Sequence, residues 1–184
     1  VVDLDPQANA TSSLGVDKRA VQASTYDALL AGDVPVASIL YNERLQISLL
    51  PSSPALAGAE IELVDEMGRE FKLRKALESL DGKFDYILID CPPSLGILTV
   101  NGLVASRDGV LVPVQCEYLA LEGLGQISQT IERVRSVLFP ELRVRGVILT
   151  MFDPRTNLSA DVVKEVSNHF PGQVFKSVIP RSIR

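Results

Sequence analysis

The stretch Phe84-Asp85-Tyr86-Ile87-Leu88-Ile89-Asp90-Cys91-Pro92-Pro93-Ser94 decides the predicted fold. Its four consecutive apolar residues, 86 to 89, are too few for a typical helix, and two prolines soon end the segment. Because isoleucine and tyrosine favour strands, the run predicts a strand that is buried on both faces, as in a parallel sheet. This strand ends in a carboxylate, Asp90, followed by a rigid turn.

Asp90 has two interpretations at this stage. In open α/β sheets, ligands bind outside the carboxyl ends of the strands, and an aspartate at that place suits a hydrated Mg²⁺ beside a nucleotide. An aspartate after a strand also commonly caps the turn that follows it. The segment alone favours neither interpretation, because motifs this short also match by chance.

Strand and helix patterns alternate along the rest of the chain. Short apolar runs that end at proline or glycine predict strands, and apolar residues that recur every three or four positions predict helices. The expected strands lie at 1–4, 45–50, 109–114, 147–149 and 174–179, and the main helices lie within 24–32, 55–80, 97–105, 121–138 and 158–170. Repeated βαβ units predict an α/β fold with a doubly wound, mostly parallel sheet flanked by helices.

The composition is that of an ordinary globular protein. The 184 residues suit one domain, and 46% of them are hydrophobic. The net charge of −5 creates no overall positive field that would attract nucleic acid or an anionic membrane, so any such contact requires a local patch. The two cysteines have neither disulfide nor metal spacing, which favours a reducing compartment. No apolar run approaches 18 residues, so no membrane span is expected.

Polar side chains follow several of the predicted strands. They are Asp3 and Asp5, Asp90, Gln115 and Glu117, Thr150 with Asp153 and Arg155, and Arg181. Three aspartates at two neighbouring strand ends would repel one another unless a cation or hydrogen-bond donors offset their charge. A phosphate-bound Mg²⁺ is a natural offset. Nucleotide hydrolysis needs one carboxylate near the metal and another near the attacking water.

Six segments of the chain resemble, in order, those of the ParA/Soj family, the chromosome- and plasmid-partitioning ATPases with a deviant Walker A loop. The segments are Val2-Asp3-Leu4-Asp5-Pro6-Gln7, Ile89-Asp90-Cys91-Pro92-Pro93-Ser94-Leu95, Pro113-Val114-Gln115-Cys116-Glu117-Tyr118, Leu121-Glu122-Gly123, Thr150-Met151-Phe152-Asp153-Pro154-Arg155-Thr156 and Val178-Ile179-Pro180-Arg181. The match runs from Val1 to Arg184. It implies a fold like that of the P-loop NTPases.

The resemblance assigns roles to individual positions. Asp5 resembles the catalytic switch aspartate that orients the hydrolytic water, Asp3 the outer-shell aspartate near magnesium, and Asp90 the Walker B aspartate that holds Mg²⁺ through water. The second switch turn corresponds to Pro92, Pro93 and Ser94. The positions around the adenine ring correspond to Thr150, Met151, Asp153, Pro180 and Arg181. The basic residues that face nonspecific DNA correspond to Arg181 and Arg184.

The resemblance also implies partners and cofactors. A family member is a Mg²⁺-ATP switch that dimerises on ATP, binds DNA without sequence preference, and is reset by a ParB/Spo0J-like centromere-binding protein. It would be cytoplasmic and nucleoid-associated, with no membrane contact. Phosphate contacts made by arginines would make the DNA affinity strongly salt-dependent.

The chain departs from the family pattern at two points. Ala8 stands where the family has glycine, which predicts a slightly stiffer turn. No G-x-x-x-x-G-K-[S/T] motif occurs in the 184 residues, and the family's phosphate loop lies about thirty residues before the aspartate motif. Without its backbone amides and lysine, phosphate affinity should largely vanish. We therefore expect a single partial domain over residues 1–184, truncated at both ends, that lacks the first strand and is inactive and nucleotide-free when isolated.

Two alternatives stay open. The chain could be a complete, non-catalytic module that binds a partner or DNA without a nucleotide. It could also belong to another deviant-Walker group, such as the MinD-like proteins or the cobyrinate-type amidases. The Pro6-Gln7 pair after Asp5 and the segment from Met151 to Arg155 favour ParA/Soj over these groups.

Overall fold

The computed structural model describes residues 1–117 and 120–182, without the side chains of residues 120–122. The chain divides into two compact units, Val1–Ser106 and Arg107–Arg184, each of which is described by itself. Parallel strand pairs alternate with helices in both units, so the predicted α/β fold class is confirmed. The single partial domain stays a prediction. No helix in the described part of the chain is both long and apolar enough to cross a membrane.

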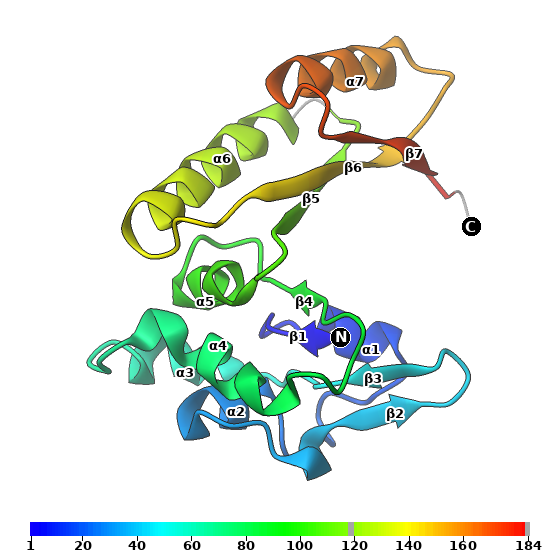
Figure 1. Ribbon diagram of the computed structural model, residues 1–184. Helices are drawn as coiled ribbons and strands as arrows, with labels where there is room; N and C mark the ends of the chain where they lie inside the picture. The colour runs from blue at the N-terminus through cyan, green and yellow to red at the C-terminus, as the bar shows by residue number, and fades with distance from the viewer. Residues whose placement is uncertain (118–119, 183–184) are drawn as a thin grey trace. The chain divides into compact units, whose positions relative to one another are not determined.

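The first unit is built around a short parallel strand pair (Figure 1). Strand β1 (Val2–Asp3) pairs with β4 (Ile89–Asp90), with Val2 opposite Ile89 and Asp3 opposite Asp90. On its other edge, β1 exchanges backbone hydrogen bonds with Leu50. Leu50 follows a hairpin of β2 (Leu40–Asn42) and β3 (Ile47–Leu49). The sequence predicted β3 and did not predict β2.

Helices and short 3₁₀ turns surround this strand pair. They are α1 (Asn9–Ser13), α2 (Thr25–Ala31), α3 (Leu56–Glu62), α4 (Lys72–Leu77) and α5 (Ile97–Ala105), with 3₁₀ turns η1 (Val36–Ser38), η2 (Arg69–Phe71) and η3 (Glu78–Leu80). The helix predicted within 24–32 is confirmed: Ser24 and Asp27 form a capping box at its start, and Gly32 ends it in the left-handed conformation. Leu4, Leu29, Leu56, Leu73 and Leu98 are completely buried in the apolar core of this unit.

Strand β4 is shorter and more exposed than the sequence predicted. Tyr86 is 86% exposed and Leu88 is 57% exposed, whereas Ile87 and Ile89 pack against the core. Successive side chains of an extended segment point to opposite sides. Within the described residues of this unit, the core covers the side on which Ile87 and Ile89 lie, and the side of Tyr86 and Leu88 is exposed. The prediction of a strand buried on both faces is therefore wrong for this unit.

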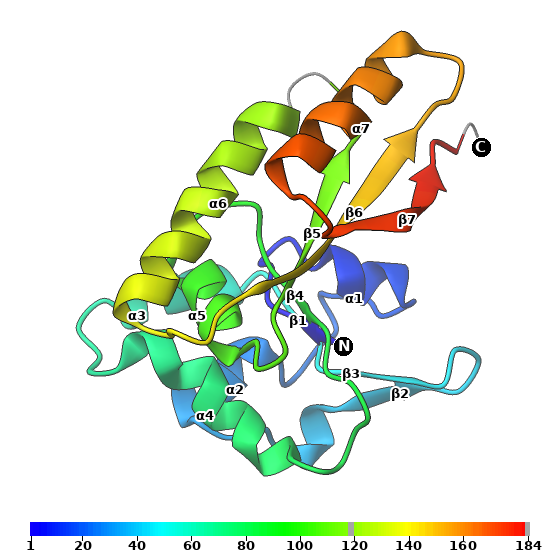
Figure 2. The ribbon, with the colours of Figure 1, turned by 45° about the horizontal axis from the view of Figure 1, so that its top comes forward.

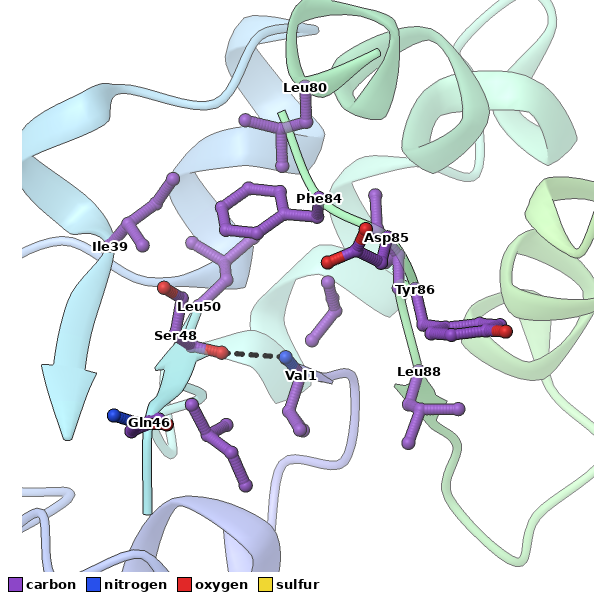
Figure 3. A pocket seen from close by; sticks show the side chains of 13 residues that line it. Val1, Ile39, Gln46, Ser48, Leu50, Leu80, Phe84, Asp85, Tyr86 and Leu88 are labelled. Atoms are coloured by element: carbon purple, nitrogen blue, oxygen red, sulfur yellow. Dashed lines mark hydrogen bonds between the residues drawn. The ribbon is translucent and has the colours of Figure 1, made fainter. Parts of the chain in front are cut away.

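A cavity of about 350 Å³ lies in the first unit at the amino-terminal end of β1 (Figure 3). Apolar side chains such as Leu50, Leu80 and Phe84 form much of its wall. The Val1 amino group lies in it and donates a 2.7 Å hydrogen bond to the Ser48 carbonyl. Because the carboxyl ends of β1 and β4 lie at the opposite end of the strands, this cavity is separate from Asp3, Asp5 and Asp90.

The second unit is a three-stranded parallel sheet in the order β5 (Val110–Gln115), β6 (Val144–Phe152) and β7 (Val174–Pro180). The crossover helices α6 (Ala120–Val137) and α7 (Asn157–His169) lie on the same face of the sheet (Figure 2). Their buried residues are Leu124, Ile131 and Val134 on α6, and Ser159, Val162 and Val166 on α7. Five of these six, all except Ser159, belong to the apolar stripes of the two predicted helices; the Leu121 side chain lies outside the described residues.

Candidate functional site

Three aspartates gather at the carboxyl ends of β1 and β4. The parallel register places Asp3 directly opposite Asp90, and Asp5 follows two residues after Asp3. The pKa of Asp90 is raised, first because the protein partly desolvates its carboxyl and then because Asp3 and Asp5 repel its negative charge. The structure thus brings together the three carboxylates that the sequence predicted to meet, at an edge with surplus negative charge.

Asp3 is completely buried, and hydrogen bonds from one short loop hold its carboxylate. Oδ1 accepts a 3.2 Å bond from the Asp5 backbone N–H, whereas Oδ2 accepts bonds from the Thr11 N–H at 2.7 Å and the Thr11 hydroxyl at 2.6 Å. The Asp3 carbonyl also accepts a 2.7 Å bond from the hydroxyl of Thr25. Both carboxylate oxygens of Asp3 therefore accept hydrogen bonds from the residues that follow β1, and this residue fixes the local backbone.

Asp5 occupies a tight turn just after β1. Its Oδ1 accepts a 2.9 Å bond from the Gln7 N–H, and its carbonyl accepts a 2.7 Å bond from the Ser52 hydroxyl. The Asp5 residue is only 8% exposed. Ala8, where the family pattern has glycine, adopts the left-handed conformation with φ of 53°. An alanine in that region carries backbone strain that a glycine would avoid.

The donor set at this edge suits a hydrated cation rather than a cage of protein ligands. Among residues 1–117 and 120–182, no group of three or more His, Cys, Asp and Glu side chains is arranged to hold a metal ion. Mg²⁺ is usually bound through one or two carboxylates, several waters and substrate phosphates. Asp90, whose carboxyl faces solvent and is repelled by its neighbours, fits the role of such a carboxylate.

The turn after Asp90 is fixed by hydrogen bonds from α5. Pro92 is buried, whereas Pro93 and Ser94 are exposed. The hydroxyl of Thr99, in the first turns of α5, donates to the Ser94 carbonyl at 2.5 Å and to the Pro92 carbonyl at 3.2 Å. The predicted switch turn is therefore tied to α5 by one buried side chain.

A second set of predicted residues meets at the carboxyl ends of β6 and β7. Pro180 lies opposite Phe152 in the parallel register, and the Arg181 N–H donates a 3.0 Å bond to the Phe152 carbonyl. This brings Thr150, Met151 and Asp153 to the same edge as Pro180 and Arg181. Met151 has a φ of 54°, a strained value for a residue with a side chain.

Ion pairs organise this edge of the second unit. Arg155 binds Asp153 through Nε at 2.9 Å and Nη2 at 2.8 Å, and these bonds lower the pKa of Asp153 to about 2. Arg181 forms an ion pair with Glu117, which follows β5. Arg184, the other predicted DNA contact, lies outside the described residues.

The sequence did not identify the hydroxyl groups that hold the backbone around Asp3 and Asp5. Thr11, Thr25 and Ser52 are all buried and bonded to Asp3 or Asp5. Thr11 and Ser52 are 41 residues apart in the chain, so no local pattern connects them. One indication of this constrained turn was present in the sequence: Ala8 stands where the family has glycine, and it adopts the left-handed conformation.

Comparisons with known proteins agree with this arrangement. A family model described as an AAA domain matches residues 1–144. The chromosome partitioning protein ParA of Myxococcus xanthus is 49% identical over the whole chain, which spans 65% of that relative. The sporulation initiation inhibitor protein Soj of Bacillus subtilis is also 49% identical, and the chain spans 72% of it.

A solved structure, cobyrinic acid a,c-diamide synthase from Mycobacterium smegmatis with bound ADP and magnesium, has a TM-score of 0.91 and 43% identity. It matches 100% of this chain, which covers 74% of that structure. The predicted family is therefore confirmed by relatives that match from the first residue to the last. The chain belongs to the ParA/Soj family of partitioning ATPases.

Proposed function

We propose that the gene product is a Mg²⁺-ATP-dependent partitioning switch in which Asp5 and Asp90 share the hydrolytic site. The observation that carries this proposal is the register of β1 and β4, which groups Asp3, Asp5 and Asp90 at one strand-end edge. The raised pKa of Asp90 supports it, because a cation at this edge would relieve the repulsion. The magnesium- and ADP-bound relative supports Mg²⁺ and ATP as the cofactors.

In this proposal the residues have separate tasks. Asp90 would hold Mg²⁺ through water, and Asp5 would orient the attacking water. Asp3, the outer-shell aspartate of this proposal, holds the Asp5 turn. A bound Mg²⁺ would neutralise charge that develops on the phosphates. The family resemblance assigns base contacts to Thr150, Met151, Asp153 and Pro180 within the second unit, and a phosphate-responsive turn to Pro92, Pro93 and Ser94 within the first.

The experiment compares Asp5→Ala with Asp85→Ala in the full-length gene product. Asp85 is an exposed aspartate on the segment before β4, so its loss controls for a change in surface charge. We expect Asp5→Ala to lower ATP turnover at least ~10²-fold and to trap the ATP-bound state, with Asp85→Ala unchanged. Normal hydrolysis by Asp5→Ala would show that the assignment of Asp5 is wrong.

Nucleotide binding by residues 1–184 alone is a separate question. Calorimetry with Mg²⁺-ATP on this segment tests it directly. We expect no binding, because the segment holds no glycine-lysine phosphate loop. Binding in the micromolar range would show that these residues form a nucleotide site without that loop.

The proposed switch also dimerises on ATP, binds nonspecific DNA, and is reset by a ParB/Spo0J-like partner in the cytoplasm at the nucleoid. Arg181 is half-exposed, and its ion pair with Glu117 would exchange for a DNA phosphate. Arg181→Ala should weaken binding equally to unrelated DNA sequences and reduce the slope of log K against log salt by about one. A sequence-dependent loss would contradict a phosphate contact.

The diamide synthase supports a second candidate function, an ATP-dependent amidation. Both candidates use the same nucleotide site, so the ATPase assay alone does not separate them. Stimulation of hydrolysis by DNA and a centromere-binding protein supports partitioning. Formation of an amide from a cobyrinate with an amide-nitrogen donor, without such stimulation, would favour the synthase.

A further inference from the structure

The segment from Asp3, in β1, to Thr11, in α1, is called the aspartate loop here, and one buried hydroxyl connects its two ends. Thr11 is fully buried, and its Oγ1 donates a 2.6 Å bond to Asp3 Oδ2. Its backbone N–H donates to the same oxygen at 2.7 Å. Because Asp3 belongs to β1, these two bonds attach the end of the loop to the strand from which the loop emerges.

The same hydroxyl connects the loop to a second segment. Thr11 Oγ1 accepts a 2.9 Å bond from the Ser52 N–H, and Ser52 Oγ donates a 2.7 Å bond to the Asp5 carbonyl. Thr11 thus uses its hydroxyl both as donor and as acceptor. Valine has a similar shape but no hydroxyl, so it can make neither of these two bonds.

The loop between these tethers is strained. Ala8 lies inside it in the left-handed conformation, and the Ser12 hydroxyl donates to its carbonyl at 2.9 Å. A left-handed alanine persists only where the surrounding structure determines the conformation. The bonds of Thr11 and Ser52 provide that determination, because they fix the loop at Asp3, Asp5 and Thr11.

We propose that Thr11 is a positioning residue for Asp5: its hydroxyl, with Ser52, holds the strained aspartate loop in the conformation that presents Asp5 to the attacking water. This inference rests on the proposed function for its catalytic consequence. The loop geometry itself does not depend on that function.

The kinetic test compares Thr11→Val, Thr11→Ser and Ser38→Ala in the full-length gene product. Ser38 is another buried hydroxyl of the first unit; it bonds to the Pro35 carbonyl and serves as the matched control. We expect Thr11→Val to lower kcat about 10- to 100-fold with the KM for ATP changed less than about twofold. Thr11→Ser, which keeps the hydroxyl, should stay within about threefold of wild type, and Ser38→Ala should match wild type.

Hydrogen exchange provides a readout that needs no ATPase activity. In Thr11→Val, the amides of Asp5, Thr11 and Ser52 should exchange at least about tenfold faster, and in Thr11→Ser they should keep their protection. If the wild type does not hydrolyse ATP, the proposed function fails while exchange still decides the loop geometry. Unchanged exchange in Thr11→Val, or unchanged kcat in an active enzyme, would overturn the inference.

Two further variants keep the test decisive if Thr11→Val does not fold. Ser52→Ala removes only the bond to the Asp5 carbonyl and should lower kcat in the same direction. Ala8→Gly in the Thr11→Val background removes the strain that the tethers oppose, and should recover part of the lost kcat. A Ser52→Ala enzyme with wild-type kcat would overturn the inference by itself.

Discussion

Two aspartate-proline turns of the chain have the same local form in opposite environments. In Asp5-Pro6-Gln7 and Asp153-Pro154-Arg155, the aspartate Oδ1 accepts a bond from the backbone N–H two residues later, at 2.9 Å and 3.0 Å. Each turn follows a parallel strand and has a left-handed residue nearby, Ala8 or Met151. The side-chain hydrogen bonds to the first turn come from buried hydroxyls, whereas the second turn combines the Asp153–Arg155 ion pair with hydroxyl bonds to Thr156 and Ser159.

The comparison shows how a strand end can be fixed in two ways. Buried neutral donors hold the first turn in place. Removing one of them leaves its buried acceptor without any hydrogen-bond partner, because water does not reach it. The Arg155 ion pair adds little to the second turn, because solvent and salt screen it, and the hydroxyls of Thr156 and Ser159 also bond to Asp153. Loss of the buried groups beside the first turn should therefore cost more stability than loss of this ion pair, whose effect should be salt-sensitive.

The largest effect should come from the buried carboxylate. Asp3→Ala leaves the N–H and hydroxyl of Thr11 without an acceptor, and should lower the free energy of unfolding by about 2–4 kcal/mol. Asp153→Ala, which removes a carboxylate paired with the exposed Arg155, should have a much smaller effect. Urea denaturation of both variants checks this, and equal losses would contradict the contrast between the two turns.

A smaller loss should follow from removing one buried hydroxyl beside the first turn. Thr25 Oγ1 donates to the carbonyls of Asp3 and Pro51, so Thr25→Val should cost about 1–2 kcal/mol. Thr150→Val is the control beside the second turn, since the hydroxyl bond from Thr150 to the Val114 carbonyl is 3.4 Å long. Thermal unfolding that shifts equally in both variants would count against the buried network.

The sequence predicted most of the fold because its signals are local. Ser24, Asp27 and Gly32 form a cap-and-stop pattern within nine residues, and they bound α2 as predicted. The β2 strand was missed because its three residues, Leu40–Asn42, are too few to show an alternation of apolar and polar side chains. The exposure of Tyr86 and Leu88 was missed because burial depends on what covers a strand, which its own residues do not encode.

The candidate site was predictable in part for the same reason. Strand ends located Asp3, Asp5 and Asp90, because parallel strands bring their carboxyl ends to one edge. Thr11 and Ser52 are bonded across 41 residues, and no local pattern connects them. Ordinary threonine and serine residues give no sign that they are buried, so only the folded structure could reveal these tethers.

Strain in the two turns should respond differently to glycine. Ala8→Gly should stabilise the protein by at most about 0.5–1 kcal/mol, because glycine adopts the left-handed conformation without strain but the buried methyl group of Ala8 is lost. Met151→Gly relieves the same strain but removes a half-buried side chain, so no net gain is expected. Chemical denaturation measures both, and a destabilised Ala8→Gly protein would show that the tethers do not hold a strained residue.

The smallest effect should be the acid titration of the second turn. Arg155 lowers the pKa of Asp153 to about 2, mainly through side-chain hydrogen bonds, from a reference of 3.8. Because the folded-state pKa is depressed, the stabilisation is complete above the reference value and is lost as the pH falls from there toward about 2. In Arg155→Ala, or in concentrated salt, an NMR titration of the Asp153 carboxyl carbon should move back toward 3.8. An unchanged titration in Arg155→Ala would show that something other than this exposed ion pair holds the turn, and the contrast with the buried hydroxyls of the first turn would be lost.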